Sequence, residues 1–220
     1  MCFSAQADLV GGVVLGAIGF DALRHIPQRP RHRALAALPL LLAAHQFVET
    51  FVWWGLQGHV SSAVGDLATW LYLLFAFWVL PIYVPLAVFL IEPPGRRRRI
   101  IAGFVGLGAI VSTTLLLAML DGSVTATLGD HHLSYGIGLH AGFAVTACYV
   151  AATCGAMLFS GYRQLFLFGL VNLVAIAVLA RLAISGFASL WCAWAAVTAA
   201  VIALHLRHGE THRSRIDVLI

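Results

Sequence analysis

Lysine is absent from the sequence, so all 13 basic residues are arginines. A retinal Schiff base needs a lysine amine, and a rhodopsin-type pigment is therefore excluded. The phosphate-binding lysine of a P-loop is also missing, and no GxxxxGK(S/T) motif occurs. The four cysteines include no CxxC pair. The three that lie in apolar segments are expected to be small core residues rather than disulfide partners.

Charge is scarce as well. Charged residues make up 10% of the chain and hydrophobic residues 61%, whereas about a quarter of the residues in a soluble domain are charged. This balance predicts an integral membrane protein. We expect no cleavable signal at the start, because "MCFSAQADLV" has no basic segment and Asp8 stands where lysine or arginine would be expected.

Seven segments are long and apolar enough to cross a membrane, which takes about 20 residues per helix. The predicted fold class is therefore all-α, a polytopic bundle of seven transmembrane helices that forms a single domain over residues 1–220, without an internal repeat. The predicted spans are Ala5–Leu23, Leu35–Leu56, Leu67–Ile91, Ile100–Leu120, Leu133–Phe159, Leu165–Ile184 and Ala188–Leu206.

The arginines predict the orientation of these spans. Twelve of the 13 lie in alternate connections or in the C-terminal tail, and the connections between them contain none. Under the positive-inside rule, the N-terminus is expected outside and the C-terminus in the cytoplasm, as in a multi-pass protein of the inner (plasma) membrane. The basic runs then contact anionic lipids at the cytoplasmic face, and no nucleic acid is needed to explain them. Trp53, near the outer end of the second span, is expected to be an interfacial anchor.

Ionisable groups lie at similar depths in four of the predicted spans. With a rise of 1.5 Å per residue, Glu49 lies about 10 Å and His45 about 16 Å below the outer end of the second span. On the same count His140 lies about 10 Å deep in the fifth span and Arg181 about 5 Å deep in the sixth. Asp8 enters the first span from the same side. Intramembrane ionisable groups are functional by default, so this coincidence predicts a site in the outer half of the bundle.

The residue types in this site fit a metal ion. His45 and Glu49 are four residues apart and project from one helix face. With His140 they would form a set of two histidines and one carboxylate, which suits Zn²⁺ or Fe²⁺ with open positions for water or substrate. In the structural alternative Glu49 pairs with Arg181 and each histidine binds a neighbouring carbonyl. A haem held by His45 and His140 is a third, less favoured interpretation.

The first 100 residues carry a resemblance to a known family. "MCFSA" at the start, "ALRHIPQRPR", "LPLLLAAHQFVETFVWW" and "PLAVFLIEPPGRRRR" resemble a family of small multi-spanning bacterial membrane proteins of unknown function. The resemblance implies a multi-helix membrane fold and a shared role for Glu49, and it implies no activity. Ser4 in this motif is a predicted N-cap of the first helix. Cys2 would then lie at the outer mouth, where a thiolate is a soft metal ligand.

Three classes of function follow from these observations. The first is a membrane-embedded metalloprotein, with His45, Glu49 and His140 as ligands, Glu49 and Arg181 as catalytic residues, and a metal-bound water as nucleophile. The second is a proton-coupled transporter or permease, in which Glu49 titrates and Arg181 is its counter-charge. The third is a non-catalytic subunit or sensor that acts through a partner membrane protein. No reaction is predicted.

Overall fold

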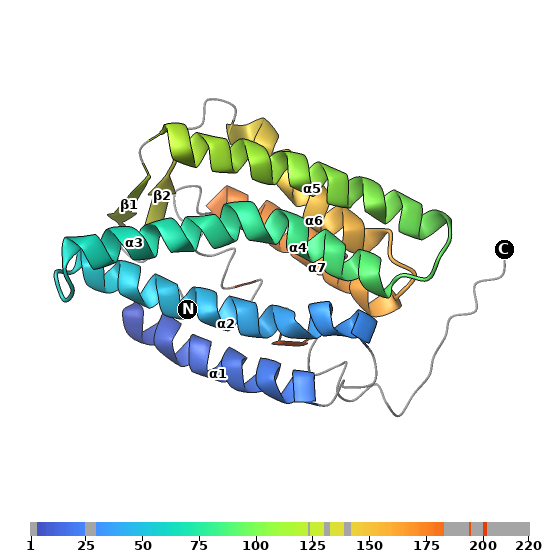
Figure 1. The fold of residues 1–220 in the computed structure, drawn as a ribbon, viewed down its shortest axis with the longest axis horizontal. Coiled ribbons are helices and arrows are strands. Elements are labelled where there is room, and N and C mark those ends of the chain that lie inside the picture. The colour runs from blue at the N-terminus through green and yellow to red at the C-terminus, as the bar shows by residue number, and fades with distance from the viewer. Residues whose placement is uncertain are drawn as a thin grey trace.

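The computed structural model describes residues 4–24, 30–122, 124–129, 133–138 and 142–182, together with positions 194, 200 and 201. The described chain is mostly helical, with one two-stranded hairpin (Figure 1). Its elements in order are α1 (Ala5–Arg24), the 3-10 turn η1 (Pro30–His32), α2 (Arg33–Leu56), α3 (Ser62–Leu73), the π-helical segment η2 (Leu74–Val79), α4 (Leu80–Ile91), α5 (Arg96–Asp121), β1 (Thr125–Leu128), β2 (Leu133–Gly136), α6 (Gly142–Leu158) and α7 (Arg163–Leu182).

Four helices are long and apolar enough to cross a membrane. They are α1, α2, α5 and the continuous helix Ser62–Ile91, which consists of α3, η2 and α4. They correspond to the first four predicted spans and agree with a membrane protein. Helices α6 and α7 are apolar over shorter lengths. The predicted seventh span lies almost entirely outside the described residues.

The prediction of one helix over Leu133–Phe159 is wrong in its first part. Residues Leu133–Gly136 form strand β2, which pairs antiparallel with β1 so that Thr125 faces Gly136 and Leu128 faces Leu133. Helix α6 begins only at Gly142. Hydropathy alone does not separate a short apolar strand from a helix. The glycines of "YGIG" disfavour a helix here, and Gly138 has a φ of +66°, a conformation that glycine adopts readily.

Helices α1 and α2 form a close antiparallel pair. A Cβ on Gly12 would lie 2.9 Å from the Phe47 ring, and a Cβ on Gly19 would lie 2.7 Å from the backbone nitrogen of Leu40. Small residues let membrane helices approach in this way. The two contacts define a register in which the start of α1 lies beside the last two turns of α2.

The next close contact joins α2 to α3. A Cβ on Gly55 would lie 2.5 Å from Gly65 Cα, so the two backbones touch where the chain turns from α2 into α3. From there α3 runs back along α2, and it continues through η2 into α4, which packs against α5 and α6 (Figure 1). The long Ser62–Ile91 helix therefore contacts the α1–α2 pair with one part of its length and the α5–α6 pair with another.

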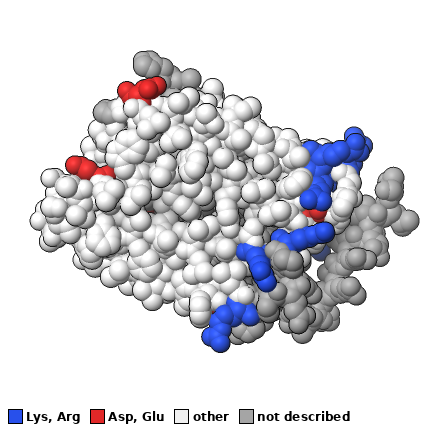
Figure 2. Space-filling model, in the orientation of Figure 1, with Lys and Arg blue, Asp and Glu red and all other residues white. Residues whose placement is uncertain are grey.

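Basic side chains on the described chain gather at one end of the bundle (Figure 2). The arginines whose side chains are described lie at the end of α1 and at the starts of α2, α5 and α7, which the antiparallel arrangement brings to one end. We call this the arginine end. Asp66 near the start of α3 and Asp121 at the end of α5 lie at the opposite end. Between the two ends, exposed side chains are largely apolar, for example Val10, Ile110 and Val174.

Candidate functional site

One face of α2 changes from apolar to polar along its length. Nearest the arginine end it buries the leucines of the first two turns. The next two turns bury four polar side chains, and the last turn is apolar again with Val52 and Trp53. The four polar residues are at most 2% exposed, and we call them the polar cluster: His45, Gln46, Glu49 and Thr50.

Helix α1 closes one side of the polar cluster. The Thr50 hydroxyl lies 3.1 Å from Gln46 O in its own helix and 3.5 Å from Ala5 O of α1. Ser4 caps α1, as predicted, because its Oγ accepts a hydrogen bond from Ala7 N at 3.2 Å. Asp8 is fully buried, and the register between the two helices places it at the depth of Glu49. Two carboxylates therefore share one level of the bundle.

Stacked aromatic rings close the other side. The His45 imidazole stacks on Tyr72 of α3, with ring centroids 4.0 Å apart and planes at 16°. Tyr72 stacks in turn on Tyr135 of β2, at 4.5 Å and 17°. The Tyr135 hydroxyl donates a hydrogen bond to Glu49 Oε1 at 3.4 Å. These four side chains make a closed ring of contacts, because His45 and Glu49 are one turn apart on α2.

Several polar atoms of this region lack a hydrogen-bond partner within the described part of the chain. They are both ring nitrogens of His45, the amide nitrogen and oxygen of Gln46, and Nε1 of Trp53. All three side chains are at most 4% exposed and project from the last three turns of α2. A buried polar group left unpaired costs about 1–3 kcal/mol. These five atoms are therefore concentrated on one helix of the described chain.

The burial of Trp53 corrects its predicted role. It is 4% exposed and packs in a cluster with Val52, Tyr72 and Leu133, so it is not an interfacial anchor. Hydropathy and position along the span do not distinguish a tryptophan at the membrane interface from one in the core. The two depend on the helix face, since Trp53 lies on the inward face of α2 and its neighbour Trp54 is only partly buried.

A π-helical segment lies directly beside His45. Phe75 of η2 contacts the imidazole with ring centroids 4.7 Å apart. π-helical segments inside α-helices are frequent at functional sites. This one has a local cause, because Pro81 follows it and has no N–H to donate to a carbonyl of the preceding turn. Ala76 O in the segment accepts a hydrogen bond from the Tyr149 hydroxyl of α6 at 2.9 Å instead.

The neighbouring helix α5 completes the environment of η2. The Ser112 hydroxyl donates to Trp78 O at 2.8 Å. Gly108 lies directly against Pro81 O, where an added Cβ would overlap that oxygen. Side-chain hydroxyls that replace missing backbone donors are the expected solution inside a membrane. The helix type therefore changes just before Pro81, within the continuous Ser62–Ile91 helix.

The structure brings two of the predicted site residues together. His45 and Glu49 share the polar cluster as predicted. His140 and Cys2 lie outside the described residues, and Arg181 lies in the last turn of α7, with its side chain outside the description. Among the described residues, no group of three His, Cys, Asp or Glu side chains is arranged to hold a metal ion.

Sequence reasoning missed the two tyrosines. Tyr135 was assigned to a helix, and Tyr72 was treated as part of an apolar span. The alternation of "TATL" and "LSYG" around the turn residues "GD" is the signal that could have revealed the hairpin. It would have placed Tyr135 near the ends of the neighbouring helices that lie away from the arginines.

A third buried carboxylate lies at the arginine end. Glu92 follows α4 and is 3% exposed. It accepts hydrogen bonds from Ser160 Oγ at 2.9 Å and from Gly161 N at 3.1 Å, in the connection between α6 and α7. Arg97 Nη1 donates to Ser160 O at 3.4 Å. Glu92 therefore links the α4–α5 connection to the α6–α7 connection, and its hydrogen-bond donors belong to the protein.

Comparison with known proteins places these features in a family. The family described as "Family of unknown function (DUF6629)" matches residues 1–216, nearly the whole chain. No curated protein and no solved structure matches. The predicted membership of a family of unknown function is confirmed at this level, and the match brings no activity with it.

Proposed function

The chain belongs to the DUF6629 family of unknown function, and we propose that it is a polytopic membrane protein with a binding site for a small polar ligand inside the bundle. The site is the polar cluster of α2 with Asp8 of α1 and the Tyr72–Tyr135 stack. We place it in the outer half of the membrane and expect His140 and Arg181 to complete it. The proposed topology has seven spans, with the N-terminus outside and the C-terminus in the cytoplasm.

One observation carries this proposal. Five buried polar atoms on His45, Gln46 and Trp53 have no hydrogen-bond partner in the described chain. Buried polar side chains normally have partners from protein or ordered water. A ligand that offers both donors and acceptors would satisfy the imidazole and the amide together. The adjacent carboxylate of Glu49 adds a preference for a ligand with a positive charge or with hydrogen-bond donors.

A metal ion is the narrower candidate. The ring nitrogens of His45 are available within the described chain, and Glu49 lies one turn away on the same helix. A Zn²⁺ or Fe²⁺ site needs a third protein ligand, which we expect from His140. In this version Glu49 and Arg181 would be the catalytic residues, the first next to the metal and the second holding an anionic group of the substrate.

The separation of charge supports the proposed orientation. The arginines whose side chains are described gather at one end of the bundle, and the positive-inside rule places such an end in the cytoplasm. The polar cluster lies towards the opposite end, because the last three turns of α2 are remote from Arg33. The bilayer and its anionic lipids are the partners that this arrangement implies, and an inner membrane is the proposed location.

The test compares two substitutions on α2 in detergent-purified protein that has been freed of metal with a chelator and of bound small molecules by exhaustive dialysis. Gln46→Leu removes an amide whose atoms have no described partner, so we expect the free energy of unfolding to rise by about 1–3 kcal/mol. Thr50→Val removes a hydroxyl that has described partners, so we expect a loss of about 1 kcal/mol. Thermal unfolding measures both. A clear loss of stability in Gln46→Leu would contradict the proposal, since it would show that the protein itself satisfies the amide.

Elemental analysis of protein purified without chelator tests the metal version. We expect near-stoichiometric zinc or iron in the wild type, none in Glu49→Gln or His140→Ala, and no change in His59→Ala, which replaces an exposed loop histidine. Absence of metal from well-folded wild-type protein would refute the metal site, and the broader proposal of a small polar ligand would remain.

The two other functional classes give different results. A proton-coupled transporter predicts no metal and a pH-dependent uptake that Glu49→Gln abolishes. A non-catalytic subunit predicts that Glu49→Gln weakens only assembly with a partner membrane protein.

A further inference from the structure

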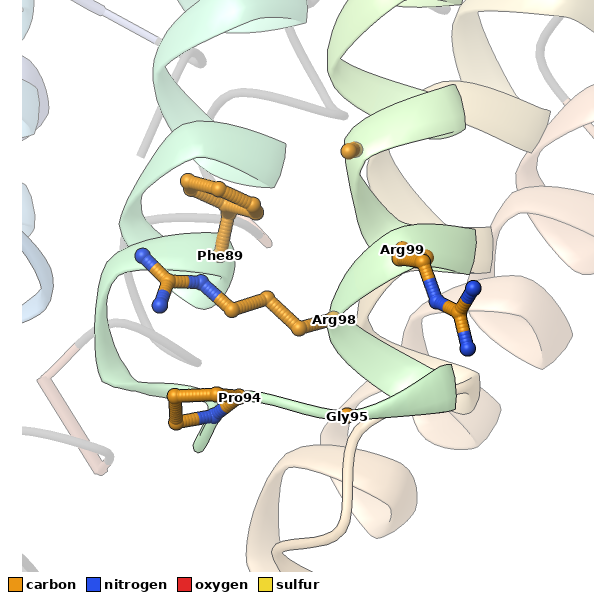
Figure 3. A pocket seen from close by; sticks show the side chains of 6 residues that line it. Phe89, Pro94, Gly95, Arg98 and Arg99 are labelled. Carbon is orange, nitrogen blue, oxygen red and sulfur yellow. The ribbon is translucent and has the colours of Figure 1, made fainter.

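A hollow of about 310 Å³ opens at the arginine end, between the last turn of α4 and the first turns of α5 (Figure 3). Its volume is at the lower end of the range for small-molecule sites. The surface inside it is mostly carbon, although two arginines contribute to its wall. The lining residues are Phe89, Pro94, Gly95, Arg98, Arg99 and Ala102.

Arg98 crosses this hollow. Its side chain leaves α5 and reaches over the Phe89 ring of α4, with the guanidinium carbon 4.4 Å from the ring centroid (Figure 3). Its Nε is buried and has no hydrogen-bond partner among the described residues. The contact with Phe89 holds the guanidinium in place through its face, which leaves the N–H groups at its edge for an acceptor. A guanidinium presented in this way suits a phosphate or carboxylate.

The charges around the hollow favour an anion as the acceptor for Arg98. Arg98 belongs to four consecutive arginines at the start of α5, and Figure 2 shows the neighbouring surface of the arginine end to be basic. The nearest buried carboxylate, Glu92, already accepts its hydrogen bonds from Ser160 and Gly161. An anion in the hollow would therefore meet positive charge and the Arg98 guanidinium, whose Nε–H has no partner in the described chain.

The apolar surface inside the hollow indicates which kind of anion would bind there. Phe89 and Ala102 present apolar surface, and the exposed sides of α4 and α5 beyond the hollow are apolar as well, for example at Leu86 and Ile110. A free phosphate would leave this surface in water. An amphiphile with a charged phosphate and a hydrocarbon part would cover it, since the hollow lies where the basic end meets the apolar sides of the bundle.

We propose that the hollow binds one anionic glycerophospholipid. The phosphate lies against the Arg98 guanidinium near Arg99, and the glycerol and the first carbons of the acyl chains cover Phe89 and Ala102. The inference rests on the membrane placement proposed above and does not depend on the polar cluster. It is a defined site for one lipid, in contrast to diffuse attraction between a basic surface and an anionic leaflet.

Native mass spectrometry of the purified full chain tests the site, with phosphatidylglycerol and phosphatidylcholine titrated in parallel. We expect the first phosphatidylglycerol to bind at least about tenfold more tightly than phosphatidylcholine. Both lipids offer a phosphate to Arg98, but the choline group of phosphatidylcholine adds a positive charge that the neighbouring arginines repel. Arg98→Gln should remove this preference. Arg96→Gln is the matched control, because it removes the same charge two residues away, from an exposed side chain that does not line the hollow.

A second variant keeps the net charge unchanged. Ala102→Phe fills the hollow from an exposed position of α5 and should weaken phosphatidylglycerol binding about as much as Arg98→Gln. Glycerol 3-phosphate at millimolar concentration should not displace the lipid. Equal losses in Arg98→Gln and Arg96→Gln, full binding in Ala102→Phe, or displacement by glycerol 3-phosphate would each overturn the proposal. A chain that carbonate washing releases from membranes would instead refute the membrane placement.

Discussion

The contact between α4 and α5 predicts that glycine-to-alanine substitutions at nearby positions of α5 change the free energy of unfolding in opposite directions. A Cβ on Gly108 would overlap Pro81 O, and it would lie 2.9 Å from the Pro81 carbonyl carbon. A Cβ on Gly103 or Gly106 would meet nothing within 4 Å. All three glycines lie in the interior of the same helix. Glycine to alanine at each position therefore changes the same intrinsic propensity in three different environments.

The expected magnitudes follow from two terms. Alanine is favoured over glycine in a helix interior by about 1 kcal/mol, so Gly103→Ala and Gly106→Ala should raise the free energy of unfolding by up to that amount. At Gly108 the added carbon meets a backbone carbonyl that cannot rotate away, and overpacking of this kind costs about 1–3 kcal/mol or more. If α5 moves away, it also weakens the Ser112–Trp78 hydrogen bond, which contributes about 1 kcal/mol. The net effect of Gly108→Ala should be a loss of about 1–3 kcal/mol.

Thermal unfolding of the detergent-purified protein, followed by size-exclusion chromatography, measures these differences. For a chain of this length, 1 kcal/mol corresponds to a shift of about 2–4 °C in the unfolding temperature. We expect the midpoint to fall in Gly108→Ala and to rise slightly or stay unchanged in the other two variants. A rise in all three would refute the described approach of α5 to Pro81, and with it the account of how η2 is held beside His45.

Two further predictions concern buried hydrogen bonds. Ser112→Ala leaves Trp78 O without its hydroxyl donor and should lower the free energy of unfolding by about 1–2 kcal/mol, whereas Thr113→Ala, at an exposed position of α5, should change it by less than about 0.5 kcal/mol; thermal unfolding compares the pair. Glu92→Gln replaces one of the two carboxylate oxygens that accept from Gly161 N with an NH₂ group, which cannot accept. It should lower the free energy of unfolding by about 1.5–3 kcal/mol. Rapid proteolysis of the connection between α6 and α7 in this variant would support the described contact, and an unchanged cleavage rate would count against it.

The helices could be predicted from the sequence because hydropathy and arginines define them independently. The predicted span Leu35–Leu56 and the observed helix α2 (Arg33–Leu56) share their end, and the predicted Ile100–Leu120 lies inside α5 (Arg96–Asp121). In each case the helix extends beyond the apolar run into its flanking charged residues. A window of about 20 apolar residues reports the membrane-crossing part and not the complete helix.

The hairpin could not be predicted in the same way. Strands β1 and β2 are four residues each, and both lie next to long apolar segments that dominate any hydropathy window. Their existence depends on cross-strand pairing and on the burial of Leu133, which is fully covered by other parts of the fold. The alternation within the two strands is a local signal, but the burial of Leu133 by segments that are distant in sequence is not visible in local periodicity.

The candidate site was predictable only along α2. The spacing of His45 and Glu49 places them on one face of any helix, and the structure has them there. The other residues of the site come from three elements that are distant from one another in sequence. Tyr72 comes from α3 and Tyr135 from β2, and Asp8 reaches the same level only through the register of α1 on α2. No spacing rule connects these residues.

The position of the polar cluster argues that stability alone does not explain it. Along α2, the polar residues separate two apolar clusters, one ending at Leu42 and Ala43 and the other beginning at Val52. Leucines at the intervening positions would join the two clusters into one continuous core. Replacing buried polar groups by apolar ones of similar volume is often neutral or stabilising, so the polar residues are not required for packing. Since His45 and Gln46 also leave hydrogen-bonding atoms without described partners, the cluster costs stability as it stands. A bound ligand would recover that cost, and a bundle without one would be more stable with leucine at both positions.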